Sequence, residues 1–131
     1  MYYLDTNICI YYLKGVKSVR DSMLTVSPKD IRIPAMVKAE LLYGAYKSQK
    51  KEENIRKLRA FLSAFDSEPF SDSCTEKYAA LRSELERNGT PVGPNDMIIA
   101  ATVIAKGGTL VTHNTKEFER INQLNVIDWV R

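Results

Sequence analysis

Three acidic side chains occupy positions at which parallel-sheet proteins gather their working groups. Asp5 ends the apolar run 1–4, Asp96 opens an apolar stretch after a loop rich in glycine and proline, and Glu117 follows the apolar segment 109–112. Because the carboxyl ends of parallel strands meet at one edge of a sheet, we expect these carboxylates to converge. Oxygen-rich clusters with open positions bind Mg²⁺ or Mn²⁺, and such ions promote phosphoryl-ester chemistry. The pattern predicts a metal-dependent site for phosphodiesters.

Glu40 is the fourth acid of interest. It belongs to a stretch with helical character, and its neighbours at one-turn spacing are Met36 and Gly44. It is therefore predicted to point into apolar surroundings, where an unpaired carboxylate costs several kcal/mol and needs a compensating cation or polar network. Gly44 has no side chain to cover the preceding turn, which leaves space above Glu40 for a ligand.

Each acid also has a simpler structural explanation. Asp5, Thr6 and Asn7 are each suitable N-caps for a helix that begins at Ile8, and Asp96 complements the dipole of its helix. Glu40 can pair with an arginine, and Glu117 can be solvated. Taken singly, these explanations are the more common ones, so the metal site depends on all four acids lying together.

Polar side chains beside the acids are candidates for auxiliary roles. Thr112 and Asn114 follow a predicted strand and are suited to orient a water molecule at the metal, and Asn7 lies two residues beyond Asp5. The single histidine, His113, is interpreted as a loop residue rather than a catalytic base, although its pKa range suits a base. No grouping of cysteine and histidine indicates zinc.

The elements that must position these residues alternate between strands and helices. The predicted strands are 1–4, 31–33, 68–70, 109–112 and 126–128. The predicted helices are 8–13, 17–26, 35–48, 50–65, 71–88 and 97–105, with a helical turn within 113–118. This alternation predicts an α/β fold with a mainly parallel sheet between two helical layers. Helices 35–48 and 50–65 are expected to form a hairpin.

Composition limits the class of protein. The chain has 131 residues, 44% hydrophobic and 27% charged, which predicts a single globular domain over residues 1–131. The net charge of +3 permits a polyanionic partner without requiring one. Cys9 and Cys74 are interpreted as reduced thiols of a cytoplasmic protein. No signal segment or membrane-spanning apolar run is present.

Four motifs surround the acids in order along the chain. They are Leu4-Asp5-Thr6-Asn7, Met36–Leu41 with Gly44, Gly93–Ala101 and Leu110–Phe118. Together they resemble the VapC toxins of the PIN-domain ribonucleases, over essentially the whole chain. The resemblance implies a PIN-like three-layer α/β/α sandwich with a central, mainly parallel sheet.

The resemblance also implies an activity and partners. It implies the toxin of a type II toxin–antitoxin system, an endoribonuclease that uses Mg²⁺ or Mn²⁺ and a metal-activated water. Asp5, Glu40 and Asp96 match the family's main acidic positions and its metal ligands. Many relatives have Asp in the fourth position, where Glu117 is the matching acid here and Asn114 a substitute or helper. A homodimer and a VapB-type antitoxin, whose apolar helix brings an Arg towards the acids, are expected.

Two other functions remain open from the residues themselves. An Asp-nucleophile phosphohydrolase, as in haloacid dehalogenase-like proteins, would use Asp5, but the second Asp of that motif is replaced by Asn7. A catalytically silent nucleic-acid-binding or regulatory module would use Asp5 as a cap and Glu40 in a structural ion pair. The sequence does not identify the RNA. If the acids converge, like-charge repulsion predicts a raised pKa for at least one carboxyl in the metal-free protein.

Overall fold

A five-stranded parallel sheet forms the centre of the computed structural model, which describes residues 1–131. The strands are β1 (Tyr2–Leu4), β2 (Ile31–Pro34), β3 (Asp66–Glu68), β4 (Thr109–Val111) and β5 (Asn125–Ile127), in the order β3-β2-β1-β4-β5. The helices are α1 (Thr6–Leu13), α2 (Lys17–Leu24), α3 (Ala35–Tyr46), α4 (Lys51–Leu62), α5 (Asp72–Arg87), α6 (Pro94–Ala105) and α7 (Thr115–Phe118). A 3₁₀ turn, Pro28–Asp30, precedes β2.

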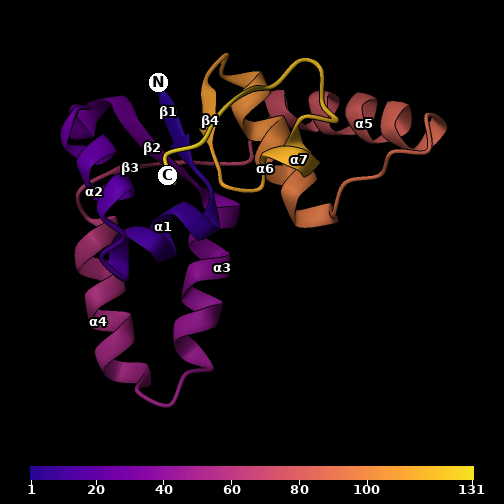
Figure 1. Cartoon of the computed structure of the whole chain (residues 1–131). Helices are drawn as coiled ribbons and strands as arrows, with labels where there is room; N and C mark the ends of the chain where they lie inside the picture. The colour runs from indigo at the N-terminus through magenta and orange to yellow at the C-terminus, as the bar shows by residue number, and fades with distance from the viewer.

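Helices cover both faces of this sheet. Figure 1 shows α1 to α4 on one side of the strands and α5 to α7 on the other. The chain moves from β1 towards β3 in its first half and from β3 towards β5 in its second. Because right-handed crossovers in opposite directions cover opposite faces of a sheet, the two sets of helices lie on different sides. The three-layer α/β/α architecture is confirmed, and the sheet, predicted as mainly parallel, is parallel throughout.

The strand order makes the carboxyl ends of β1 and β4 the topological switch point of the sheet. From β1 the chain crosses to β2 on one side, whereas β4 on its other side comes from the second half of the chain. Leu4 is in register with Val111, and the Asp5 amide donates to the Val111 carbonyl at 2.9 Å. Asp5 and Thr112 therefore leave neighbouring strands at the same level, where open α/β sheets bind ligands.

Apolar packing on both faces holds that edge in place. Leu4, Leu110 and Val111 are fully buried in the central strands, and Ile99 and Val103 of α6 are fully buried against them. They belong to a core cluster of 26 buried residues that includes side chains from both helical layers. Because the sheet is covered on both faces, its strands read as continuous apolar runs.

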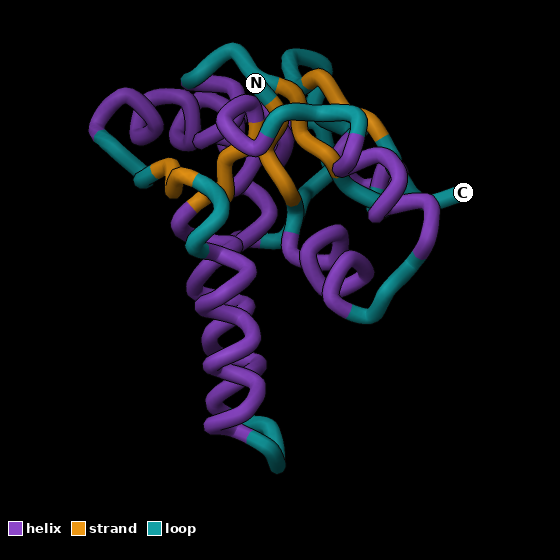
Figure 2. The backbone as a smooth tube through the Cα atoms, turned by 90° about the vertical axis from the view of Figure 1, so that its left-hand side faces the viewer, coloured by secondary structure: helices purple, strands orange, loops and turns teal.

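Two predicted boundaries were wrong for identifiable reasons. β3 ends at Glu68 instead of spanning 68–70, because Pro69 has no amide hydrogen with which to continue the ladder to β2. α6 begins at Pro94 rather than at Met97, because proline is well tolerated in the first turn of a helix. Asp96 therefore lies inside the first turn of α6. The other elements agree with prediction to within a few residues, and α3 and α4 form the expected hairpin, which projects from the body in Figures 1 and 2.

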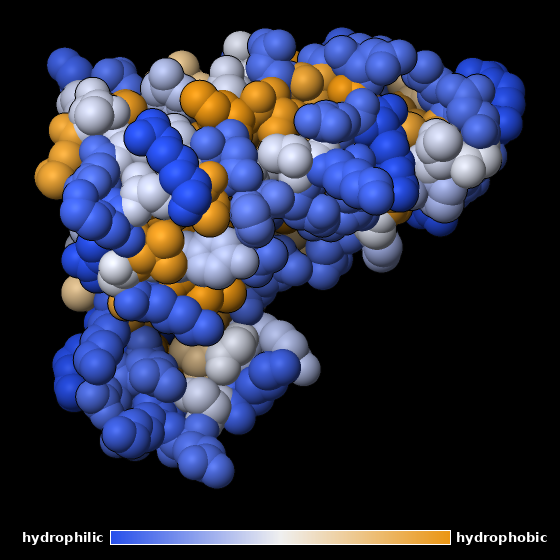
Figure 3. All heavy atoms as spheres, viewed as in Figure 1, coloured by the Kyte–Doolittle hydropathy of each residue, from blue (hydrophilic) through white to orange (hydrophobic).

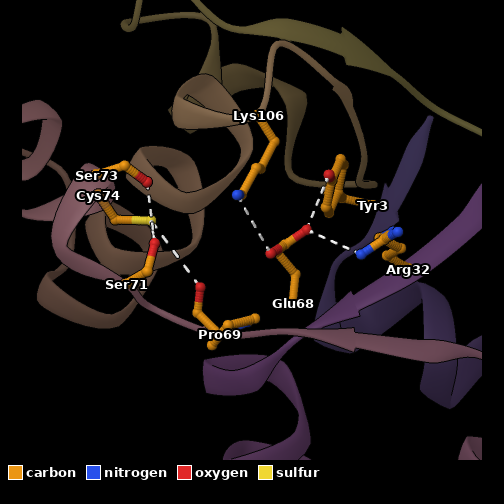
Figure 4. Close-up of polar contacts among 8 residues, drawn as sticks. All are labelled: Tyr3, Arg32, Glu68, Pro69, Ser71, Ser73, Cys74 and Lys106. Atoms are coloured by element: carbon orange, nitrogen blue, oxygen red, sulfur yellow. Dashed lines mark hydrogen bonds and ion pairs between the residues drawn. The ribbon is translucent and has the colours of Figure 1, made fainter.

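A second buried carboxylate, Glu68, stabilises the opposite part of the sheet. Its Oε1 accepts from the Tyr3 hydroxyl at 3.3 Å and lies 3.4 Å from Nη1 of Arg32, while Nζ of Lys106 lies 3.8 Å from its Oε2 (Figure 4). Burial, followed by the Glu68 charge, raises the pKa of the Tyr3 hydroxyl. Cys74 lies at the edge of the same view, close to the Pro69 carbonyl. Glu68 thus has the cationic partners that a buried carboxylate requires, and it belongs to the scaffold.

Both cysteines are buried and free, as expected. No helix of the chain is long and apolar enough to cross a membrane.

Candidate acidic active site

Asp5 stands directly after β1 and is buried. Its Oδ1 accepts from the Thr6 amide at 2.8 Å, which makes Asp5 the N-cap of α1. Its Oδ2 accepts from the hydroxyl of Thr112, at the end of β4, at 2.7 Å. The Asp5 carboxylate thus caps α1 and is also oriented by Thr112. Its role as a cap therefore does not exclude a role in a functional site.

Glu40 reaches the same region from α3. Its Oε1 accepts from the Thr6 hydroxyl at 2.7 Å, and the side-chain amide of Asn95 lies 3.5 Å from its Oε2. The side chain is partly exposed and lines a groove together with Ile10, Leu41 and Leu58, so the predicted apolar neighbours are present although the carboxylate is not buried. A polar network of neutral donors accompanies Glu40, and no arginine pairs with it. A Cβ added at Gly44 would meet nothing within 4 Å, in agreement with the predicted space.

Asp96 and Glu117 form a pair at the N-terminus of α6. Both carboxylates lie beside Gly93, whose Cβ, if it had one, would be 3.7 Å from Oε1 of Glu117 and 3.9 Å from Oδ2 of Asp96. The Gly93 amide donates to Oε1 of Glu117 at 3.0 Å, and the side-chain amide of Asn114 donates to its Oε2. Asn114 therefore orients Glu117.

The pKa values indicate that Asp96 and Glu117 share a proton. Burial raises the pKa of Asp96 to about 7, and the charge of Glu117 adds to the rise, with smaller contributions from Asp5 and Glu40. Burial also acts to raise the pKa of Glu117, but the hydrogen bonds from Gly93, Asp96 and Asn114 lower it overall. Asp96 is thus the proton donor of the pair. The expectation of a raised carboxyl pKa is confirmed, although burial contributes more than like-charge repulsion.

Asp5 also titrates above its usual range. Burial is the largest cause of its raised pKa, the hydrogen bonds from Thr112 and Thr6 oppose the rise, and the charges of Glu40 and Glu117 support it. The charges of Glu117, Asp5 and Glu40 also raise the pKa of Asp96, so the four acids lie close enough to interact electrostatically. None of the four forms an ion pair with a lysine or arginine, in contrast to Glu68.

The auxiliary candidates differ in their contacts. Thr112 is fully buried, and its hydroxyl orients Asp5. The same hydroxyl accepts from the backbone amide of Asn114 at 3.0 Å. Asn7 is exposed and makes no side-chain hydrogen bond to an acid. His113 is an exposed loop residue, as expected, and its Nδ1 lies 2.9 Å from Oδ2 of Asp128.

Sequence reasoning missed three residues that shape the cluster. Thr6 bridges Asp5 and Glu40, Asn95 approaches Glu40, and the Gly93 amide holds Glu117. Each lies within three residues of a predicted acid. Their role depends on the spatial meeting of α1, α3 and α6, which no local sequence pattern encodes.

Comparison with known proteins identifies the family of the chain. The sequence profile of the PIN domain matches residues 2–124. Ribonuclease VapC2 of Rickettsia felis is 46% identical over 131 residues, which cover 98% of each chain. The chain belongs to the PIN-domain family and its VapC ribonucleases. The VapC of Shigella flexneri, named a tRNA(fMet)-specific endonuclease, is 36% identical over 96% of each chain.

A solved structure of a VapC relative has the same fold. The crystal structure of VapBC2 from Rickettsia felis bound to a DNA fragment from their promoter contains a chain with a TM-score of 0.93 and 45% identity, over 98% of both chains. The sequence resemblance to VapC toxins is therefore confirmed, and with it the PIN-like fold and the assignment of this chain to a family of ribonucleases.

The donor chemistry of the cluster suits the divalent ions on which PIN nucleases generally depend. All of its ligand candidates are oxygens, the donors preferred by hard divalent cations, and the shared proton marks where a cation can replace it. As the side chains stand, no group of three or more His, Cys, Asp or Glu residues is close enough to hold an ion. Ligation of one ion by three of these carboxylates therefore requires them to lie closer together than they do here.

Proposed function

We propose that this protein is the toxin of a type II toxin–antitoxin system, an endoribonuclease whose Asp5, Glu40 and Asp96 hold Mg²⁺ or Mn²⁺. Glu117 completes the acidic site. The observation that carries this proposal is the convergence of the acids: burial raises the pKa of Asp96 to about 7, and the charges of Glu117, Asp5 and Glu40 add to the rise. Solvated or capping acids that stood far apart would not raise the pKa of Asp96 in this way.

The residues of the chain have distinct tasks in hydrolysis. A bound divalent ion supplies an activated water and stabilises the charge that develops on the phosphoryl oxygens. Thr112 and the Thr6 amide fix the two oxygens of Asp5, and the Thr6 hydroxyl fixes Glu40. Asp96 gives up its proton when the site takes up a cation. Asn114 orients Glu117.

An apolar groove beside Glu40 is the proposed site for a VapB-type antitoxin. It has a volume of about 500 Å³ and lies between α1, α3 and α4. Its apolar lining consists of Ile10, Leu13, Leu41, Ala45 and Leu58. The groove is also lined by Lys14 and Lys57, neither of which forms an ion pair with Glu40. Because Glu40 lies on its wall, an apolar antitoxin helix in the groove can bring an Arg to the acids. VapB partners are named in the solved structures of VapBC relatives.

Further features of the protein follow from the family. We infer a homodimer that assembles with antitoxin into a larger complex, and a single domain over residues 1–131, supported by its continuous sheet and core cluster. An RNA substrate and two free cysteines support a cytoplasmic location. Initiator tRNA is the first substrate to test, because the Shigella flexneri relative is named for it.

A metal-titrated cleavage assay tests the proposed function. The purified protein is incubated with RNA in EDTA, Mg²⁺ or Mn²⁺, and the new 5′ ends are sequenced. Cleavage is expected only with metal, and Asp5→Asn or Asp96→Asn should abolish it without unfolding the protein. Asp66→Asn, an exposed acid of β3, is the matched control and should cleave normally. Binding of RNA without metal-dependent cleavage would instead favour a catalytically silent module.

A further inference from the structure

Tyr43 and Tyr46 form an exposed aromatic stripe along α3, which starts near the acidic cluster and extends towards the tip of the α3–α4 hairpin. The side chains of Tyr43 and Tyr46 are 66% and 53% exposed, more than any other aromatic residue of the chain. Nζ of Lys47 lies 4.8 Å from the centroid of the Tyr43 ring, and Nζ of Lys51 lies 5.5 Å from that of Tyr46. Each exposed ring therefore has an ammonium group beside it, and neither ring contributes to the core.

The stripe begins one helical turn from the candidate active site. Tyr43 and Lys47 follow Glu40 by three and seven residues, so they share its helix face, and Tyr46 lies one turn beyond Tyr43. Along the helix axis, Tyr43 and Tyr46 are roughly 4.5 and 9 Å from Glu40. Figures 1 and 2 show that α3 and α4 project from the body. A single RNA strand that lies along α3 would therefore end at the acids.

This part of the chain also concentrates positive charge. Residues 38–51 contain four lysines (38, 47, 50 and 51) and one acid, Glu40, which gives 4 − 1 = +3, the net charge of the whole chain. None of these lysines forms an ion pair. Unpaired ammonium groups beside exposed rings suit a polyanion that also presents flat aromatic groups.

The apolar groove and the stripe lie on different sides of α3. Leu41, Gly44 and Ala45 face the groove, whereas Tyr43 and Tyr46 do not line it. Figure 3 shows the end of the α3–α4 hairpin as mainly hydrophilic, without the orange patches of the body. A protein interface needs a larger apolar centre than two tyrosines among lysines provide.

We propose that Tyr43 and Tyr46, together with Lys47 and Lys51, form a platform that binds an unpaired stretch of the RNA substrate and leads it to the acidic site. Bases stack on the two rings, and the lysines contact the phosphates that connect them. The platform rests on the proposed ribonuclease function and extends it, because it selects RNA whose cleavage site is flanked by unpaired nucleotides. A continuous duplex keeps its bases stacked inside the helix and offers none to the rings.

Binding of RNA by a catalytically inactive protein tests the platform separately from catalysis. In an Asp5→Asn background, the dissociation constant is measured for a single-stranded oligoribonucleotide and for a duplex of the same sequence. Tyr43→Leu should weaken single-strand binding about tenfold, as expected for one lost base stack, whereas Tyr43→Phe keeps the ring and the affinity. Fluorescence of 2-aminopurine in the oligonucleotide should be quenched by the protein and by Tyr43→Phe, but much less by Tyr43→Leu.

The lysines have their own readout and matched controls. Lys47→Gln and Lys51→Gln should each reduce the slope of log affinity against log salt by about 0.7, the value for one phosphate contact to a single strand. Lys77→Gln on α5 and Phe70→Leu before α5 change exposed residues elsewhere and should leave binding unchanged. In the active enzyme, the Tyr43→Leu effect should fall on KM rather than on kcat.

Three results would overturn the platform. Equal RNA affinity for Tyr43→Leu and Tyr43→Phe removes the stacking role. Equal binding of duplex and single strand removes the selection for unpaired nucleotides. Loss of antitoxin affinity with unchanged RNA affinity assigns the stripe to a protein partner instead. If the wild-type protein failed to cleave RNA, the proposed function would fall, while the binding comparison would still decide whether the stripe is an RNA surface.

Discussion

Neutral donors hold the carboxylates of the candidate site in place. Thr112, Thr6 and Asn114 donate to Asp5, Glu40 and Glu117, whereas the buried Glu68 of the scaffold has Arg32 and Lys106 as partners. The difference matters because a neutral donor orients a carboxylate without cancelling its charge. That charge then remains available for a cation. In the metal-free protein, a proton shared by Asp96 and Glu117 lowers the repulsion.

Residue type and position drew attention to the four acids: Asp5 and Glu117 follow strands, Asp96 opens a helix after a loop, and Glu40 has Met36 and Gly44 at one-turn spacing. The interaction of Asp96 with Glu117 was not predictable in detail, because it depends on the approach of α6 to α7. Thr6 and Gly93 were missed for the same reason, because each contacts an acid on another element. The Thr6 hydroxyl donates to Glu40, and the Gly93 amide donates to Glu117.

The shared proton predicts how stability depends on pH. A carboxyl whose folded pKa is about 7 and whose unfolded pKa is near 3.8 binds its proton more tightly in the native state. Its stabilising contribution is complete below the unfolded pKa and is lost as the pH rises through 7. In EDTA, the wild-type melting temperature should fall between pH 5 and pH 8 by a few degrees. That corresponds to about 1 kcal/mol, because solvent screens a partly exposed group.

Asp96→Asn is the matched variant for this measurement. It removes the titrating group and keeps the shape, so it should melt higher than the wild type at pH 8 in EDTA and should lack this part of the pH dependence. Mg²⁺ should raise the melting temperature of the wild type and change that of the variant much less. If Asp96 only complemented the helix dipole, the variant would instead lose about 0.3 to 1 kcal/mol and melt lower.

Thr112 is predicted to be a positioning residue. Thr112→Val keeps the volume but leaves Oδ2 of Asp5 and the Asn114 amide without their partner. Loss of such an orienting bond typically reduces metal affinity or activity 10- to 100-fold. Steady-state cleavage rates and Mn²⁺ titration measure this effect.

Thr102→Val provides a stringent control, since Thr102 is equally buried but donates only to the Ile98 carbonyl within α6. It should keep full activity. A similar loss of activity in both variants would show that Thr112 acts through stability alone.

At the scale of elements, hydrophobic runs predicted four of the five strands and the helical hairpin. β3 (Asp66–Glu68) contains no apolar residue and overlaps its predicted range only at Glu68. The ends of elements depended on single residues: Asp5 begins α1 at Thr6 by capping it, and β3 ends at Glu68, directly before Pro69. Glu40 stays partly exposed although its neighbours at one-turn spacing are Met36 and Gly44. Periodicity identifies the buried face of a helix but not its depth in the fold.

The turn between α6 and β4 offers a prediction about packing. A Cβ at Gly108 would lie 2.3 Å from Cε2 of Tyr3 and 3.1 Å from the backbone oxygen of Met1, so Gly108→Ala must displace β1 or the Tyr3 ring. Overpacking of this kind costs about 1 to 3 kcal/mol and should lower the melting temperature by several degrees. Gly44→Ala, where the added Cβ meets nothing within 4 Å, should instead stabilise α3 by about 0.5 to 1 kcal/mol. A Gly108→Ala protein that melts like the wild type would contradict the packing described here.

At the scale of the whole molecule, the chain separates its charges. The acids meet at the carboxyl ends of β1 and β4, while the excess positive charge lies along α3 and the hairpin tip. The sequence predicts each group, and the strand order brings the acids together by placing β1 beside β4. Local periodicity does not specify which strands pair, so the strand order could not be predicted from it.

Metal binding at a pH below 7 tests the central claim most directly, because it asks whether a cation takes the place of the shared proton. Calorimetric titration of the metal-free protein with Mn²⁺ at pH 6, in buffers of different ionisation enthalpy, gives the number of protons released. We predict release of close to one proton per bound ion for the wild type, falling towards zero at pH 8. Asp96→Asn should bind Mn²⁺ weakly and release none. Tight binding of Mn²⁺ with no proton release at pH 6, or equal binding by the wild type and Asp96→Asn, would contradict a shared metal site built on these four acids.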